Sequence, residues 1–150
     1  MAVETHSIVT AESKHAIRFP EPGAQLASGA LVACFPAAPE SPGRARRLLA
    51  DALRACDCEP GLVDAAALVL SELASNAVRH VGSPFSIRAT LEGATLRLAV
   101  EDHGWLSRAA MVVRQAHGLG VVDALAADWG VKPTARGKLV WVELPLGAVN

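Results

Sequence analysis

The sequence predicts a two-layer α+β sandwich, in which a mixed, mainly antiparallel sheet carries helices on one face. Three observations predict this fold class. Segments 85–91 and 95–101 alternate apolar and polar residues around a short turn, which indicates a hairpin with one buried face. Two segments with apolar residues at helical spacing precede this hairpin. Apolar residues make up 51% of 150 positions, enough for the core of one domain.

The elements are expected in the order β-α-α-β-β-α-β-β. Residues 1–28 carry no sustained period and are expected to form a weakly ordered extension to a domain over 29–150. The apolar run 30–35 stops at a proline, as a buried or edge strand would. Ser41 is expected to cap the first helix, whose apolar positions repeat as far as Cys56.

The second helix, expected over 61–81, carries a polar stripe. Its first half is apolar almost all round, so it should be buried. Five polar side chains nevertheless recur at offsets that share one helical face, namely Glu72, Ser75, Asn76, Arg79 and His80. Glu72 and Asn76 lie one turn apart and offer carboxylate and amide oxygens, which suit Mg²⁺ together with substrate phosphates. The plainer alternative is a solvent-facing stripe on a half-buried helix.

Two glycine-containing turns are further candidates. Asp102-His103-Gly104 follows a strand, where a carboxylate can accept a hydrogen bond from the exocyclic amine of adenine. Gly118-Leu119-Gly120 opens a third helix, where phosphates can approach backbone N–H groups. Each turn taken alone is equally explained by ordinary turn chemistry. Strands at 129–134 and 138–144 are expected to close the sheet, with Trp129 and Trp141 forming a cross-strand core pair.

Composition excludes several function classes. A net charge of -1 argues against direct nucleic-acid binding, which normally needs a basic surplus. Apolar runs are too short for a membrane span, and no secretory signal is recognised, so a reducing cytoplasm is the expected location. Three cysteines do not suggest a disulfide framework. The C-x-C spacing of Cys56 and Cys58 does not predict a zinc site.

The motifs in this order resemble the ATP-binding fold shared by histidine kinases, Hsp90, gyrase and MutL, and more narrowly the bacterial anti-sigma-factor serine kinases. SELASNAVRH (71–80) resembles the N box, EDHG (101–104) the first glycine box, and HGLGVVDALAADWGV (117–131) the second. GKLVWVEL (137–144) is similar to the closing strand. The resemblance covers about residues 30–146.

The resemblance implies a role for each matching residue. Asn76 would ligate the Mg²⁺ that bridges the ATP phosphates, and Glu72 would be the catalytic base. Asp102 would bind the adenine amine beside Gly104, with residues 103–117 as a lid. The remaining nucleotide-contacting positions implied by the boxes are Arg79, His80, Gly118, Leu119 and Gly120.

The function implied is that of an ATP-dependent protein serine/threonine kinase that phosphorylates an anti-sigma antagonist. The implied partners are a sigma factor, that antagonist, or both, and relatives of this kind often form homodimers. Leu106 and Leu139 stand where the family commonly has glycine and threonine. These departures favour an alternative, a catalytically weak or inactive nucleotide-dependent module that sequesters a sigma factor or its antagonist. A third alternative is an α/β interaction domain without a ligand.

Overall fold

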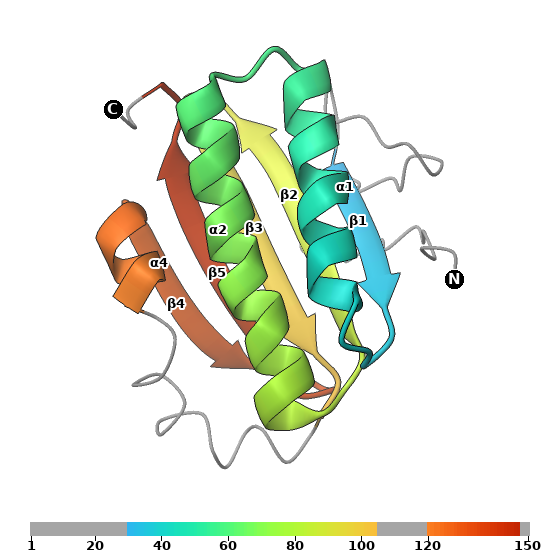
Figure 1. The fold of residues 1–150 in the computed structure, drawn as a ribbon. Helices are drawn as coiled ribbons and strands as arrows, with labels where there is room; N and C mark the ends of the chain where they lie inside the picture. Colours follow the sequence, from blue (N-terminus) through green and yellow to red (C-terminus); the bar gives the residue numbers. More distant parts are fainter. Residues whose placement is uncertain (1–29, 105–119, 148–150) are drawn as a thin grey trace.

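The computed structural model describes residues 30–104 and 120–147, which form two layers (Figure 1). One layer is a five-stranded sheet and the other contains the helices. The strands are β1 (Ala30–Phe35), β2 (Phe85–Glu92), β3 (Thr95–Asp102), β4 (Asp128–Pro133) and β5 (Lys138–Pro145). The helices are α1 (Ser41–Ala55), α2 (Pro60–Asn76), the π-helical turn η1 (Ala77–Val81) and α4 (Gly120–Leu125).

The strands follow the order β1-β2-β3-β5-β4 across the sheet. All four pairings between these described strands are antiparallel, so the sheet is antiparallel rather than mixed. The helices cover one face, as the sequence predicts (Figure 1). The α+β class and the two-layer architecture are therefore confirmed, and the element order is the expected one.

Helix α1 begins differently from the prediction. Glu40 occupies the capping position and makes no side-chain cap, while Ser41 is the first helical residue and is 1% exposed. The Ser41 hydroxyl has no hydrogen-bond partner among the described residues. Ser41 does not cap the helix, because it lies inside the first turn and Glu40 takes the capping position.

Helix α2 begins at Pro60, where proline costs no hydrogen bond. The expected single helix divides after Asn76, because the next five residues form the π-helical turn η1. Gly82, with φ of 65°, ends it in the left-handed conformation. A π turn rotates less per residue than an α turn, so η1 interrupts the five-residue polar stripe.

The core lies between the helix layer and one face of the sheet. Alternate residues of β3 and β5 point toward the helices and are buried, among them Leu96, Leu98 and Val142. Helix α2 contacts β3, β5 and α4. The continuous helical stretch Pro60–Val81 is long and apolar enough to cross a membrane by length and composition. Its packing on the sheet explains its apolar character equally well.

The predicted pairing of two tryptophans is wrong. Trp129 lies opposite Val142, whereas Trp141 lies opposite Gly130, so the two indoles are one position out of register. Trp129 packs against the core, and its Nε1 donates to the Asp123 carboxylate of α4 at 3.0 Å. Trp141 covers Gly130, where a Cβ would lie 2.7 Å from the indole. Because side chains alternate along a strand, this shift of one residue places the indoles on opposite faces.

Candidate functional site

The last turns of α2 place Glu72 and Asn76 one above the other. Both residues are half-buried, and α2 ends at the same end of the sheet as β3 (Figure 1). Within the described ranges, neither side chain makes a hydrogen bond or ion pair with the rest of the protein. Two half-buried polar groups without protein partners are available to a ligand.

These two side chains fit a magnesium–nucleotide complex by their donor chemistry. Mg²⁺ keeps several waters and takes one or two protein oxygens together with substrate phosphates. No cluster of three or more His, Cys, Asp or Glu residues occurs in the described part of the chain. A cation held by protein ligands alone is therefore not supported there, whereas one shared with phosphates needs only such a pair.

Arg79 and His80 lie beyond Asn76, on η1, and are exposed. The π-helical turn breaks the α-helical spacing on which their placement beside Glu72 and Asn76 was predicted. Their contact with a nucleotide stays a prediction.

Asp102 is the last residue of β3 and is 3% exposed. Its Oδ2 accepts a hydrogen bond from the Nζ of Lys138 at 2.6 Å, in an ion pair between the first residue of β5 and the last of β3. Its Oδ1 accepts longer bonds, at 3.4 Å each, from the backbone N–H groups of Gly104 and Lys138. The carboxylate is thus held firmly at the strand end.

Two glycines allow the chain to close around Asp102. A Cβ at Gly137 would lie 2.5 Å from the Asp102 Oδ1 and 2.6 Å from its backbone oxygen, so only glycine fits. A Cβ at Gly104 would collide with Cγ1 of Val81 on η1. Gly104 therefore lets the end of β3 pack against Val81, the residue that follows the predicted N box.

His103 continues this strand end. Its backbone N–H donates to the Ser83 hydroxyl at 3.1 Å, and its Nε2 lies 3.0 Å from the Ser86 hydroxyl. Burial, and next the nearby Arg136 guanidinium, lower the pKa of His103, while Glu101 and Asp102 act in the opposite direction. The imidazole is therefore mostly neutral at pH 7.

The glycine turn of the predicted second box is described only in part. Gly120 begins α4 and is exposed, and no atom of the other described residues lies within 4 Å of where its Cβ would be. Several predicted positions lie outside the described residues, namely Gly118, Leu119 and residues 105–117 of the expected lid, which include Leu106. The extension 1–28 also lies outside them. The phosphate-binding role of this turn stays a prediction.

Comparison with known proteins decides the family. Residues 35–143 match the histidine kinase-like ATPase domain. The chain belongs to the histidine kinase-like ATPase domain family. No curated protein matches the chain. Among thirteen matching chains of solved structures is the crystal structure of the RsbU and RsbW domains of Rv1364c from Mycobacterium tuberculosis.

The similarity to that structure has a TM-score of 0.64 at 20% sequence identity and covers 86% of this chain. It covers only 34% of the other chain, so the present chain spans about a third of that protein. At this identity the likeness shows the fold. The histidine kinase-like ATPase family implies ATP binding. The roles of the individual residues in the predicted N box and glycine boxes stay predictions.

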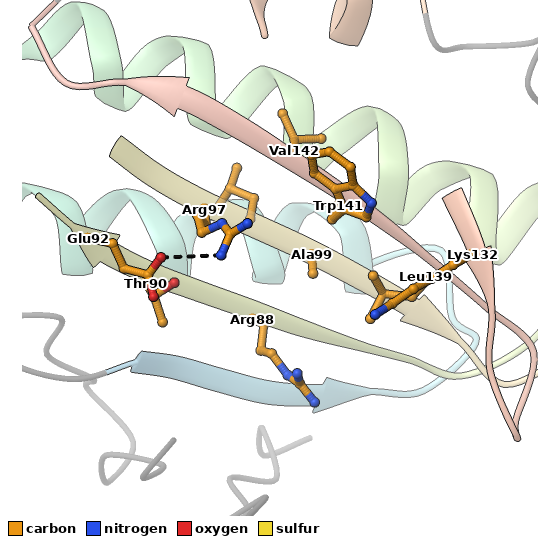
Figure 2. Close-up of a pocket in the computed structure, with 10 residues that line it drawn as sticks. Arg88, Thr90, Glu92, Arg97, Ala99, Lys132, Leu139, Trp141 and Val142 are labelled. Carbon is orange, nitrogen blue, oxygen red and sulfur yellow. Dashed lines mark hydrogen bonds and ion pairs between the residues drawn. The ribbon is translucent and has the colours of Figure 1, made fainter. Parts of the chain in front are cut away.

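Within this histidine kinase-like ATPase domain, the partner of Asp102 differs from the expected one. Leu139 was compared with the family threonine that assists at adenine, but it points to the helix-free face of the sheet (Figure 2). Lys138 instead lies opposite Asp102 in the β3–β5 register. The sequence held a signal for this, because Lys138 is in phase with the buried residues Val140 and Val142 and therefore needs a counter-ion.

The helix-free face carries a pocket of about 310 Å³ between the strands (Figure 2). Arg97 lines it and is paired with Glu92 at 3.3 Å and with Glu143 at 2.8 Å. Asp102 and the end of α2 do not line it. This pocket is therefore separate from the predicted nucleotide site.

The cysteines take no part in the candidate site. Cys34, Cys56 and Cys58 are all free thiols and half-buried. Burial raises the pKa of the Cys58 thiol, with smaller contributions from Cys56 and Asp57. A raised pKa disfavours the thiolate that binds metal. The expectation that Cys56 and Cys58 form no zinc site stays a prediction.

Proposed function

We propose that this histidine kinase-like ATPase domain is a cytoplasmic protein serine/threonine kinase of the anti-sigma-factor type, which transfers phosphate from ATP to an anti-sigma antagonist. One observation carries the proposal. Glu72 and Asn76 present a carboxylate and an amide without protein partners within the described ranges, at the end of the sheet where Asp102 lies. The motif resemblance over residues 30–146 and the family support the same function.

In the proposed complex, ATP lies between the end of α2 and the Asp102 strand end. Asp102 accepts a hydrogen bond from the adenine amine, and the Gly104 backbone lies beside the ring. Asn76 would hold Mg²⁺, which supplies charge neutralisation for the phosphates. Phosphoryl transfer requires mainly positioning and electrostatic stabilisation from the protein.

Glu72 is the proposed base. Its carboxylate accepts the proton of a serine or threonine hydroxyl on the antagonist, whose oxygen forms a bond to the γ-phosphorus. The bond from that phosphorus to the β–γ bridging oxygen breaks, and ADP leaves with the electron pair. Because Glu72 is half-buried and has no protein partner in the described part of the chain, its oxygens are available for this proton.

The test is phosphate transfer from labelled ATP to a purified anti-sigma antagonist. Glu72→Gln keeps the size of the side chain and removes the base, so transfer should fall by on the order of 100-fold or more, with ATP binding retained. Asp64→Asn, an exposed change on the same helix, is the matched control and should leave transfer unchanged. Transfer at the wild-type rate by Glu72→Gln contradicts the assignment of the base.

One observation favours a second function, a nucleotide-dependent module that sequesters a sigma factor or its antagonist without turnover. The Asp102 carboxylate already has Lys138 as its ion-pair partner, so the predicted adenine subsite departs from the family pattern with threonine. The same assay separates the two functions. Stable, ATP-dependent binding of the antagonist or of a sigma factor, without any phosphate transfer, supports the second.

A further inference from the structure

Lys138 is a buried cation at the predicted nucleotide site. Its side chain is 8% exposed, and its Nζ donates to the Asp102 carboxylate at 2.6 Å. An ammonium has three N–H donors. Within the described part of the chain, Asp102 is the one side-chain partner of this ammonium. At least one strong, desolvated donor is therefore available beside the carboxylate.

The second oxygen of the Asp102 carboxylate is held by longer hydrogen bonds than the first. Its Oδ1 receives two backbone N–H groups at 3.4 Å, near the upper limit for a hydrogen bond. Lys138 and Asp102 are direct register partners on β5 and β3, and both point toward the helix layer. The sheet thus presents a fixed donor and a fixed acceptor side by side.

This arrangement complements one edge of adenine, where a 6-amino donor adjoins the N1 ring acceptor. Breaking the buried ion pair would leave an unpaired charge of each sign in a dry site, which is strongly unfavourable. A base that approaches Asp102 therefore meets Lys138 in place. The intact pair can bind the amino group through Asp102 and the ring nitrogen through Lys138.

We propose, on the basis of the proposed function, that Lys138 is a base-binding residue whose Nζ donates a hydrogen bond to adenine N1 while Asp102 accepts one from the 6-amino group. Lys138 then takes over the donor role at the base, and Leu139 on the opposite face of the sheet is irrelevant to nucleotide affinity. The ion pair is part of the recognition surface and does not block it.

The first experiment changes only the ligand. Isothermal titration of the full chain with ATP is compared with 1-deaza-ATP, in which N1 is replaced by C–H. A hydrogen bond to a charged donor predicts that ATP binds roughly 10- to 150-fold more tightly. This comparison uses the wild-type protein, so it does not depend on whether a variant folds.

The second experiment removes the donor. Lys138→Met keeps the length of the side chain, and it should bind ATP and 1-deaza-ATP with affinities within about twofold of each other. Lys132→Met, at an exposed lysine of β4, is the matched control and should retain the wild-type preference. A merely structural role of Lys138 would weaken binding of both ligands and keep their ratio.

Three results overturn the inference. The first is that the wild-type protein binds ATP and 1-deaza-ATP equally well, and the second is that Lys138→Met still prefers ATP. The third is tighter ATP binding by Lys138→Met, which would show that the ion pair competes with the base. In all three cases ATP still binds, so the proposed function stands. Absence of ATP binding to the wild-type protein overturns the proposed function and this inference together.

Discussion

Gly137 shows how closely single residues are fitted around Asp102. A methyl group at this position would meet Asp102 Oδ1 at 2.5 Å, its backbone oxygen at 2.6 Å and the Gly104 oxygen at 3.0 Å. Backbone atoms cannot move aside cheaply, and the Lys138–Asp102 pair lies next to the clash. The close packing at this strand end therefore depends on the absence of a side chain.

We expect Gly137→Ala to lower the free energy of unfolding by about 1–3 kcal/mol, as other overpacked sites do. Urea unfolding followed by circular dichroism measures this change. Gly43→Ala is the matched control, because its Cβ meets only the tip of Arg47 at 3.7 Å inside α1. The control should be stabilised by about 0.5–1 kcal/mol, the usual gain for alanine in a helix. If Gly137→Ala changed the free energy of unfolding by the same amount as Gly43→Ala, the packing argument would be contradicted.

His103 predicts a pH dependence of stability. Burial lowers its pKa in the folded state below the ordinary value of 6.5, so the unfolded chain binds more protons between the two values. The stability contributed by the neutral imidazole is present above pH 6.5 and is lost as the pH falls through the folded pKa. Urea midpoints should therefore decrease on acidification from pH 7.5 to 5.

The control for this prediction is His103→Gln, which keeps a hydrogen-bonding group near Ser86 and does not titrate. Its urea midpoint should change less over the same pH range. A wild-type midpoint that rises on acidification would have the wrong sign and would contradict the lowered pKa.

At the scale of single elements, replacing the serine at the start of α1 is not expected to lower stability, although replacing a capping serine usually does. A serine that caps a helix is worth about 1 kcal/mol, so its replacement by alanine destabilises. Ser41 is buried, and its hydroxyl has no partner among the described residues. Ser41→Ala should therefore leave the free energy of unfolding unchanged or raise it by about 1 kcal/mol. If urea unfolding shows that Ser41→Ala lowers the free energy of unfolding by about 1 kcal/mol, Ser41 acts as a cap after all.

Elements set by local patterns could be predicted from the sequence. The β2–β3 hairpin follows from alternation over adjacent residues, and Pro60 marks the start of α2 because proline suits a first helical turn. The π-helical turn η1 could not be predicted, since the residues 77–81 continue an α-helical period. The close approach of Gly104 to Val81 on η1 depends on tertiary packing.

Contacts that depend on register were less predictable. Asp102 and Lys138 are 36 positions apart, and only the β3–β5 alignment makes them partners. The same uncertainty produced the wrong pairing of Trp129 with Trp141, because a shift of one residue exchanges the faces of a strand. The residue types at Glu72, Asn76 and Asp102 predicted the candidate site, but the presence of the Lys138 ammonium beside Asp102 was not predicted.

At the scale of the whole molecule, the proposed function predicts stabilisation by ligand. A nucleotide that binds only the folded chain raises the free energy of unfolding by about 2.7 kcal/mol at a hundredfold excess over its Kd. Thermal unfolding with Mg²⁺ and increasing ATP should therefore show a rising midpoint. Asp102→Ala should lose this rise, and Asp64→Asn, an exposed change, should keep it. A midpoint independent of ATP would support a domain that only binds other proteins.

The hydrogen bond between Trp129 and Asp123 makes the fluorescence of Trp129 sensitive to the position of α4. The indole belongs to β4, whereas the carboxylate belongs to α4, which begins directly after the predicted phosphate-binding turn. Any displacement of α4 would alter the polarity around that indole and shift its emission wavelength. Stopped-flow fluorescence of a variant that keeps Trp129 as its single tryptophan would then measure, without an added dye, whether ATP displaces α4.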